Sequence, residues 1–281
     1  MSKSLQNNFR HFEIEDDEFD YLRNLIYREA GINLTPAKKC LVQTRVGKLM
    51  RRRSIDGYPQ LFKMLRNDDT GQELTNLIDV ITTNHTYFFR EEEHFNYLAG
   101  TIIPELIAGK HNKHIRIWSA GCSSGEEPYS IAIVLKEQVD TKEDWTFEIF
   151  ATDLSTETLF TAEKGIYEAE TIKKLPLESK RKYFRKGKNR FGNLVKVKGN
   201  IRQLITFRRQ NLLKEPPSVP DFDIIFCRNV MIYFDHQTKE KVIDKISKKL
   251  KPDGYFITGH SESLNTIEHP FTMAKPTIYK Y

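Results

Sequence analysis

Polar side chains follow four apolar, β-prone stretches of this sequence. The first stretch, 115–120, runs into Gly121 and Gly125 and meets the paired acids Glu126 and Glu127. In an open α/β sheet, ligands bind outside the carboxyl ends of the parallel strands, so we expect the four positions to form one site. The residues at these positions are Glu127, Asp153, Asn211, Leu212, Arg228 and Asn229.

The acids in the glycine turn restrict the kind of ligand. A strand-turn-helix junction presents backbone N–H groups to phosphates, but Glu126 and Glu127 would repel a pyrophosphate. Acids suit ribose hydroxyls or a cation. Asp153 ends the second strand, as the ribose-binding acid of dinucleotide folds does; it lies 28 residues past Gly125 where those folds have about 20, a difference that a longer first helix explains. S-adenosylmethionine, a nucleoside with a sulfonium and no phosphate, fits this set. The alternative for Asp153 is a turn residue that caps its own backbone.

The elements that must hold these residues alternate between strands and helices from residue 115 onward. We expect strands at 115–120, 147–153, 204–207, 222–229 and 255–258, helices at 129–137 and 237–250, and a closing strand or hairpin at 272–281. The alternation breaks between about 165 and 203, where Gly187 and Gly192-Asn193 are turn signals. We expect an inserted β-hairpin or small antiparallel sheet there.

The residues before 110 have helical periodicity. Helices are expected from Asp16 or Asp17 to Gly31, then at 36–53, 59–66, 71–81 and 91–107, with a linker or lid at 82–90. The helix 36–53 carries seven Lys/Arg and no acid, with Arg45, Lys48 and Arg52 on one face. Since like charges on one face destabilise a helix, this face is interpreted as a docking surface for an acidic partner. The alternative is a solvated basic face.

Composition excludes several classes of protein. The chain has 281 residues, a net charge of +6 and a sequence pI of about 9.0, which allows nucleic acid, an anionic membrane or an acidic protein as partner. Its three cysteines are scattered without CxxC spacing, which argues against a disulfide framework or a structural metal site and favours a reducing, cytoplasmic setting. No metal is expected. Neither a membrane-spanning run nor a signal-peptide core is visible in the sequence.

Several long motifs resemble one known family. Residues 118–130, 225–234, 250–254 and 259–262, together with Thr83-Asn84 and Phe88-Phe89-Arg90, are similar in order and type to the CheR family of chemotaxis receptor methyltransferases. The resemblance covers nearly the whole chain. It implies a class I S-adenosylmethionine-dependent methyltransferase sheet (Rossmann-like), with an all-helical N-terminal domain and a small inserted antiparallel β-subdomain.

The resemblance also implies an activity, a partner and site residues. The enzyme would transfer a methyl group from S-adenosylmethionine to glutamate side chains on the helical cytoplasmic region of chemoreceptors, leaving S-adenosylhomocysteine. Arg90 and Tyr233 would lie nearest the methyl group, and Arg45, Lys48 and Arg52 would dock on the receptor. The cofactor contacts carried over by motif position are Asn84, Thr86, Arg90, Glu127, Asp153, Asn211, Leu212, Arg228 and Asn229. The loop at 188–193 is short, so the tethering of a receptor C-terminal peptide known for some members is not carried over.

The domains follow from these patterns. We expect a helical docking domain at 1–82, a linker and lead-in helix at 83–110, and a methyltransferase domain at 111–281 with its β-insertion at about 165–203. A monomer is expected because no apolar helical face is left over that would need a second copy of the chain to cover it.

Three other functions are kept as alternatives. A nucleic-acid methyltransferase agrees with the pI, but 228–231 lacks the Asp/Asn-Pro-Pro-Tyr motif of amine-methylating enzymes, so no nucleic acid is expected as substrate. A non-catalytic regulator of the same fold is disfavoured by the polar residues kept at four strand ends. A nicotinamide-dependent oxidoreductase is disfavoured by Glu126 and Glu127.

Overall fold

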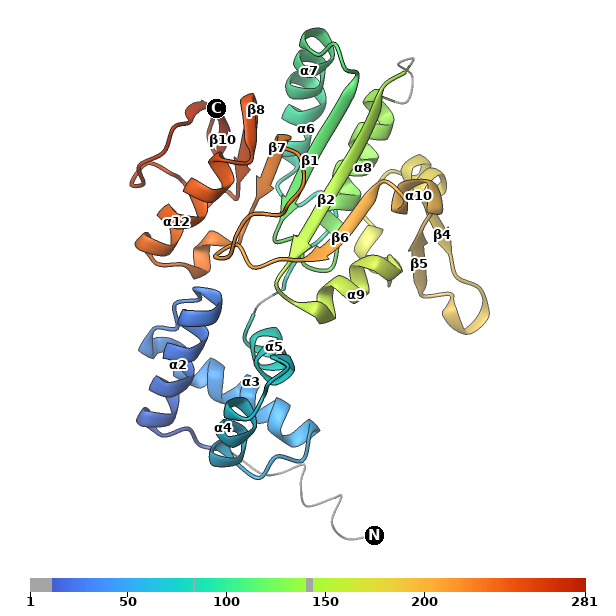
Figure 1. Cartoon of the computed structure of the whole chain (residues 1–281). Helices are drawn as coiled ribbons and strands as arrows, with labels where there is room; N and C mark the ends of the chain where they lie inside the picture. The colour runs from blue at the N-terminus through green and yellow to red at the C-terminus, as the bar shows by residue number, and fades with distance from the viewer. Residues whose placement is uncertain (1–11, 83, 140–143) are drawn as a thin grey trace. The chain divides into compact units, whose positions relative to one another are not determined.

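The computed structural model describes residues 12–82, 84–139 and 144–281, and the chain divides into two compact units (Figure 1). Unit 1 comprises the described part of Met1–Thr83 together with the short segment Tyr233–Asp235. Unit 2 comprises Asn84–Ile232 and His236–Tyr281.

Unit 1 is helical, as the periodicity predicts. Its helices are α2 (Asp16–Ala30), η2 (Pro36–Lys38), α3 (Lys39–Arg52), α4 (Tyr58–Arg66) and α5 (Gln72–Ile81). Helix α2 ends at Gly31, whose φ of 70° requires the left-handed conformation that glycine adopts readily. Its N-cap is Glu15, not Asp16 or Asp17 as expected. The backbone N–H of Glu15 donates to the Glu18 carboxylate at 3.0 Å, which leaves the two aspartates in the first turn.

Unit 2 begins with a helix that the sequence predicts as one piece. It consists of α6 (Glu92–Tyr97), the π-helical turn η3 (Leu98–Ile102) and α7 (Ile103–Gly109). Pro104 explains the break, because proline has no N–H to donate to the preceding turn and its ring crowds the carbonyl four residues earlier.

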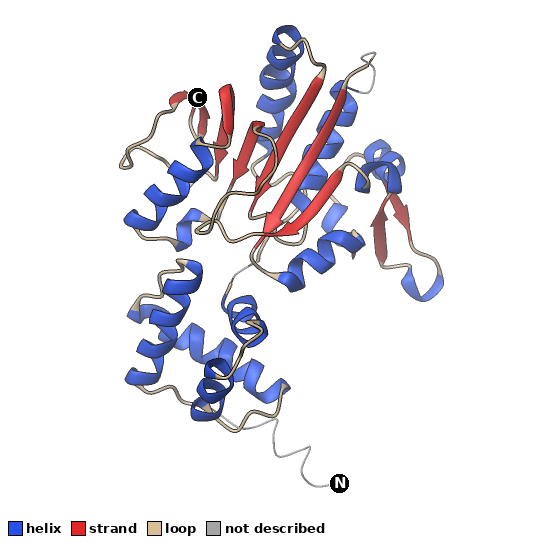
Figure 2. Ribbon diagram, viewed as in Figure 1, coloured by secondary structure: helices blue, strands red, loops and turns tan. Residues whose placement is uncertain are grey.

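A seven-stranded sheet forms the centre of unit 2 (Figure 2). Its strands are β1 (His114–Ala120), β2 (Thr146–Asp153), β6 (Ile205–Arg209), β7 (Phe222–Cys227), β8 (Leu250–Thr258), β9 (Thr272–Lys275) and β10 (Ile278–Lys280). The order is β6-β2-β1-β7-β8-β10-β9, with β6 to β8 parallel and the closing β9–β10 hairpin antiparallel. Ile117 in β1 pairs with Ile149 in β2 and with Ile224 in β7.

The helices of unit 2 follow the strands in alternation. Helices α8 (Glu126–Val139) and α9 (Thr156–Lys164) follow β1 and β2, α11 (Gly199–Arg202) precedes β6, and α12 (His236–Ser247) precedes β8. The turn η6 (Met231–Tyr233) follows β7, and its last residue is assigned to unit 1. Ser155 caps α9 as a side-chain acceptor for the Thr158 N–H at 3.3 Å. Most of α8 is buried, and its Ile131 belongs to the same core as Ile117 and Phe226 of the sheet. This is the doubly wound, mostly parallel architecture of a class I methyltransferase sheet.

The insertion is a small antiparallel sheet, as predicted. Its strands β3 (Ile166–Glu168), β4 (Phe184–Lys186) and β5 (Leu194–Val197) have the order β3-β5-β4. Helix α10 (Leu177–Tyr183) and the turns η4 (Ala169–Ile172) and η5 (Asn189–Phe191) connect them. None of the helices within the described residues is long and apolar enough to span a membrane.

Candidate functional site

The sheet order places the four predicted strand ends next to one another. Strands β6, β2, β1 and β7 are consecutive neighbours and parallel, so their carboxyl ends share one edge. The residues that follow these ends are Asn211, Asp153, the turn 121–125 and Arg228. The structure therefore brings the expected residues of unit 2 to one side of the sheet, the side where ligands of such folds bind.

The turn after β1 depends on glycine. Gly121 has a φ of 90°, and a Cβ atom at this position would lie 2.3 Å from Cγ2 of Val230. The N–H groups of Gly121 and Cys122 donate to the carbonyl of Thr152 at 2.7 and 2.8 Å, which ties the turn to the end of β2. The turn is thus held between β2 and Val230 in the loop after β7, which leaves no room for a side chain at Gly121.

The two acids after the turn lie in the first turn of α8. Glu126 is buried and accepts a hydrogen bond from the Ser124 hydroxyl at 2.7 Å. Glu127 accepts one from the Ser119 hydroxyl at 2.7 Å and pairs with Nη1 of Arg228 at 3.3 Å. Burial raises the pKa of both carboxyls, and for Glu127 the charge of Arg228 opposes that rise. Negative charge at a helix N-terminus is also favoured by the helix dipole.

Asp153 connects two of the strand ends. Its carboxylate accepts the N–H of Ser123 from the glycine turn at 2.7 Å and the N–H of Ser155 at 2.9 Å. The second bond is the turn-capping contact considered as the alternative, and it coexists with a carboxylate placed at the predicted edge. The backbone N–H of Gln210 donates to the Asp153 carbonyl at 2.9 Å. This bond fixes the chain beside Asp153 just before the half-buried residues Asn211 and Leu212.

Arg228 is the buried cation of the site. Its side chain is only 1% exposed and pairs with Glu91 at 3.0 Å as well as with Glu127 at 3.3 Å. It also donates to the carbonyl of Arg90, and its guanidinium lies 5.4 Å from the centre of the Phe95 ring. Each of its three nitrogens donates to a protein group, so the guanidinium holds Glu91 and Glu127 in place.

Asn229 is fixed in a strained conformation by Glu262. Asn229 has a φ of 59°, and its N–H donates to the Glu262 carboxylate at 2.6 Å. The same carboxylate accepts the N–H groups of Gly259 at 2.8 Å and Ile232 at 3.0 Å. A Cβ at Gly259 would lie 2.6 Å from the Asn229 amide nitrogen and 2.7 Å from Glu262. These contacts give the Gly259-to-Glu262 motif a physical role: it shapes the loop after β7.

Residues 84–90, the unit 2 part of the segment expected to be a linker or lid (82–90), contact the glycine turn and α8. The carbonyl of Asn84 accepts a hydrogen bond from the Ser123 hydroxyl at 3.1 Å, and the N–H of Phe89 donates to the Ser130 hydroxyl at 2.9 Å. Thr86 and Arg90 are half-buried, and Arg90 donates to the His85 carbonyl at 2.7 Å. The segment thus brings Asn84, Thr86 and Arg90 to the same edge as the strand ends.

The remaining predicted residues belong to unit 1. The Tyr233 carbonyl accepts the N–H of Asn33 at 2.8 Å, and Lys38 lies 5.9 Å from the centre of the Tyr233 ring. On α3, Arg45 donates to the carbonyls of Ile81 and Thr82 at 2.5 and 2.9 Å, where it caps α5.

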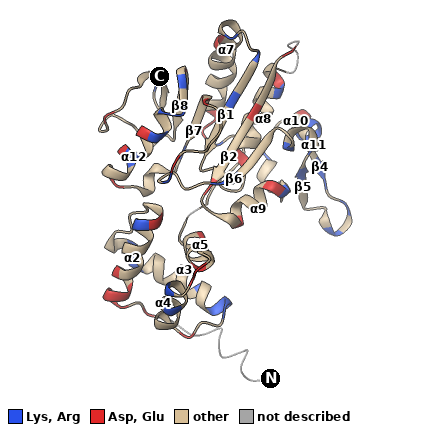
Figure 3. Cartoon of the chain, in the orientation of Figure 1, with Lys and Arg blue, Asp and Glu red and all other residues tan. Residues whose placement is uncertain are grey.

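Acids elsewhere in unit 1 pair with one cation at each end of α3; Figure 3 shows the acidic residues in red and the basic residues in blue. Lys39 pairs with Asp16, and Arg53 pairs with Glu73. Lys48 and Arg52 are exposed and make no ion pair or hydrogen bond with the described residues. These two are the cations on the predicted docking face that stay available to a partner.

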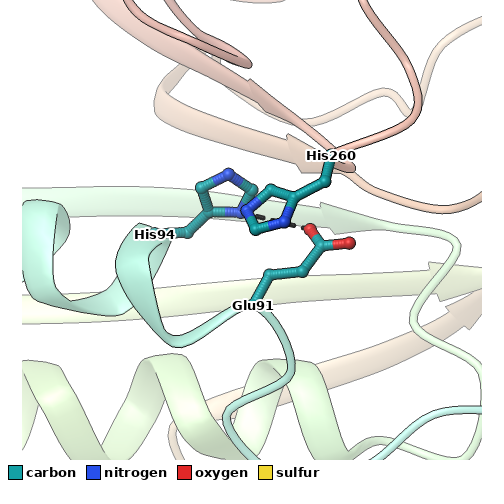
Figure 4. Close-up of side chains that lie close together, drawn as sticks. All are labelled: Glu91, His94 and His260. Atoms are coloured by element: carbon teal, nitrogen blue, oxygen red, sulfur yellow. Dashed lines mark ion pairs between the residues drawn. The ribbon is translucent and has the colours of Figure 1, made fainter.

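Sequence reasoning missed a cluster beside Arg228, formed by Glu91, His94 and His260 (Figure 4). One potential ligand atom from each lies within 4.8 Å of the others. Nδ1 of His94 is buried without a hydrogen-bond partner and lies 3.4 Å from Glu91, and burial together with the charge of Arg228 lowers the pKa of His94 to about 3. The signals in the sequence were the adjacency of Glu91 to Arg90 and the place of His260 within the motif 259–262.

The side chains at this edge suit S-adenosylmethionine. The glycine turn packs closely against protein groups, Gly121 against Val230 and Gly125 against Ala162, which fixes its path at this edge of the sheet. The acids Glu127 and Asp153 can accept hydrogen bonds from ribose or ammonium groups, and they disfavour a pyrophosphate. These features agree with a nucleoside ligand that carries positive charge.

Comparison with known proteins identifies the family. Residues 84–280 match "CheR methyltransferase, SAM binding domain", and residues 17–82 match "CheR methyltransferase, all-alpha domain". A chemotaxis protein methyltransferase of Borreliella burgdorferi is 40% identical over 92% of this chain and 93% of its own length. That of Escherichia coli is 36% identical over 95% of this chain and 91% of its own, and chemotaxis protein methyltransferase 2 of Pseudomonas aeruginosa is 35% identical over 96% and 95%. The chain therefore belongs to the CheR family and is an S-adenosylmethionine-dependent methyltransferase of chemotaxis.

Proposed function

We propose that this enzyme forms methyl esters on glutamate side chains in the helical cytoplasmic region of chemoreceptors, with S-adenosylhomocysteine as the second product. The relatives are named for chemotaxis, which supports a chemoreceptor as substrate. One observation supports a carboxylate, and not an amine, as the group that is methylated: the acids at the site already accept hydrogen bonds from protein groups. An amine would need such an acid as a free base, whereas a glutamate needs none.

The chemistry follows from the charge of the substrate. A glutamate side chain has a reference pKa of about 4.3, so it is already an anionic nucleophile near pH 7. When bound, S-adenosylmethionine supplies a methyl group activated by its sulfonium. The protein mainly has to hold the carboxylate in line with that methyl group and exclude water. Positioning of this kind contributes about 7–11 kcal/mol in favourable cases.

The roles of individual residues follow from this scheme. Asn84, Thr86, Glu127, Asp153, Asn211, Leu212 and Asn229 are proposed to bind the cofactor together with Arg90 and Arg228. Asp153 is assigned the ribose. Arg90 and Tyr233 are proposed to orient the glutamate, since a cation held tightly on the nucleophile would stabilise the ground state more than the transition state.

The docking surface is proposed on α3. Lys48 and Arg52 supply exposed cations for the acidic receptor helices, and Arg45 supports this face through the carbonyls at the end of α5. A monomeric enzyme acting in the cytoplasm, with domains at 1–82, 83–110 and 111–281, completes the proposal.

The test is the identity of the methylated group. Enzyme, methyl-labelled S-adenosylmethionine and a receptor cytoplasmic fragment are incubated together, with total RNA in a parallel reaction. The expected result is label on the receptor fragment that alkali releases, because methyl esters hydrolyse and N-methyl groups do not. Arg90→Ala should lose most of this label, whereas Arg185→Ala, an exposed arginine on β4, should keep it. Alkali-stable label, or label on RNA alone, would overturn the proposal.

A further inference from the structure

Glu91 is not among the predicted site residues, but its side chain contacts two of them, Arg228 and Asn229. It stands between Arg90 and helix α6 in a left-handed conformation, with a φ of 57°. Its side chain is 12% exposed. A non-glycine residue in this conformation carries strain, which the surrounding contacts must hold.

The contacts of Glu91 fix both Arg228 and Asn229. Oε2 accepts Nη2 of Arg228 at 3.0 Å and Nε at 3.3 Å, and Oε1 accepts the side-chain amide of Asn229 at 3.2 Å. The opposite side of the Arg228 guanidinium donates through Nη1 to Glu127 at 3.3 Å. Because the guanidinium is planar and rigid, anchoring its Nε and Nη2 on Glu91 also sets where Nη1 meets Glu127.

Because Arg228 is buried and its two acid partners are largely buried, the loss of one of these charges should have a large effect on the others. Arg228 is 1% exposed, so water cannot replace a lost partner. Removing one member of a buried charge network leaves the other charges unbalanced, which is costly compared with a surface pair. Without the Glu91 charge, Arg228 would move toward Glu127 and draw that carboxylate away from any ligand.

The neighbouring histidines invite comparison with a metal site, but the contacts of Glu91 favour a different role. Both carboxylate oxygens of Glu91 already accept N–H groups from Arg228 and Asn229. A metal ion between Glu91, His94 and His260, the three side chains drawn in Figure 4, would compete with the Arg228 guanidinium for the Glu91 carboxylate and would be repelled by its positive charge.

We propose that Glu91 is a positioning residue for cofactor binding, acting on Glu127 through Arg228 and directly on the amide of Asn229. The inference rests on the proposed assignment of Glu127 and Asn229 to the cofactor. It assigns Glu91 no contact with the methyl group or with the receptor glutamate.

The first test separates cofactor binding from the other steps. Glu91→Gln keeps the size and removes the charge, and Glu92→Gln makes the same change at an exposed neighbour. For Glu91→Gln we expect the Kd of S-adenosylhomocysteine, by calorimetry, and the KM for S-adenosylmethionine to rise about tenfold, as for loss of one charged hydrogen bond. The KM for receptor fragment and kcat should stay within about threefold. Glu92→Gln should match wild type, and a Glu91→Gln protein with wild-type affinity would overturn the inference.

The second test asks whether Glu91 acts through Glu127. In a double-mutant cycle, Glu91→Gln and Glu127→Gln together should weaken S-adenosylhomocysteine binding by less than the product of the two single effects. Independent, multiplicative effects would contradict the coupling. If Glu127→Gln alone binds like wild type, the proposed cofactor assignment fails; if it binds weakly and Glu91→Gln does not, only the role of Glu91 fails.

A third variant covers the case in which Glu91→Gln does not fold. Glu91→Asp keeps the charge, and aspartate tolerates the left-handed conformation better than most residues. Its shorter side chain cannot keep both contacts, so about threefold weaker S-adenosylhomocysteine binding is expected in a protein with a wild-type circular dichroism spectrum. Wild-type affinity in a folded Glu91→Asp protein would contradict the inference.

Discussion

Acid should destabilise unit 2 through a single buried histidine, His94. Its side chain is 2% exposed, and its Nε2 lies 2.9 Å from the Thr277 hydroxyl. Burial, with the charge of Arg228, lowers its pKa to about 3; His260 and Lys275 act in the same direction, and Glu91 opposes them. In the unfolded chain its pKa returns to about 6.5.

The sign and size of the effect follow from proton linkage. Between these two pKa values the unfolded state binds a proton that the folded state does not, so stability is full above about pH 6.5 and falls as the pH drops toward 3. From pH 7 to pH 5 the free energy of unfolding should fall by about 2 kcal/mol from this group alone. His94→Gln removes the titrating group and keeps a polar atom for Thr277.

The assay is urea unfolding at pH 7 and pH 5, followed by tryptophan fluorescence. Both tryptophans, Trp118 and Trp145, belong to unit 2, so the signal reports the unit that contains His94. Wild type should lose about 2 kcal/mol more than His94→Gln over this range. His111→Gln, at an exposed histidine, should behave like wild type. Equal losses in wild type and His94→Gln would refute the reasoning.

Three further predictions concern the site and the docking face. Gly121→Ala should lower the stability of unit 2 by about 2–4 kcal/mol, because its Cβ meets Val230 at positive φ, whereas Gly100→Ala, with open space around it, should not; urea unfolding decides. Asp153→Ala should weaken S-adenosylhomocysteine binding about tenfold or more, and equal affinity in calorimetry would remove Asp153 from the proposed site. Lys48→Glu with Arg52→Glu should raise the KM for receptor fragment about tenfold with cofactor affinity unchanged, while Lys241→Glu, a charge reversal at an exposed lysine on α12, should leave that KM unchanged.

The sequence predicted the elements well where local pattern decides them. Periodicity and turn residues located the helices of unit 1, the five parallel strands and the antiparallel insertion. The N-cap at Glu15 and the π-helical turn at Leu98–Ile102 were missed. The N-cap depends on which of several neighbouring acids takes the capping position, which periodicity does not resolve, and the π-helical turn follows from Pro104, which does not interrupt the helical periodicity of the sequence.

The site was predictable to the extent that it follows the strand ends. Asp153, Arg228 and Asn229 stand directly after or near apolar runs, so the rule for α/β sheets locates them. The sequence could not tell that Arg228 is enclosed by Glu91 and Glu127, because that contact joins segments far apart in the chain. For the same reason the sequence did not predict the hydrogen bonds of Arg45 to the end of α5, which make the basic face of α3 less open than expected, or the ion pairs of Lys39 and Arg53 near the helix ends.

The strand order has a consequence for how the chain folds during synthesis. The central strand β1 is made early, but its partner β7 follows only after β2, the whole antiparallel insertion and β6. Until then one edge of β1 is unpaired, and such long-range pairing makes folding slow and aggregation-prone. Unit 1 faces a related delay, since Tyr233–Asp235, where Phe234 pairs with Ile32, emerges after β7. The helical unit is therefore synthesised first, yet its last segment becomes available only after β7, the strand that pairs with the free edge of β1.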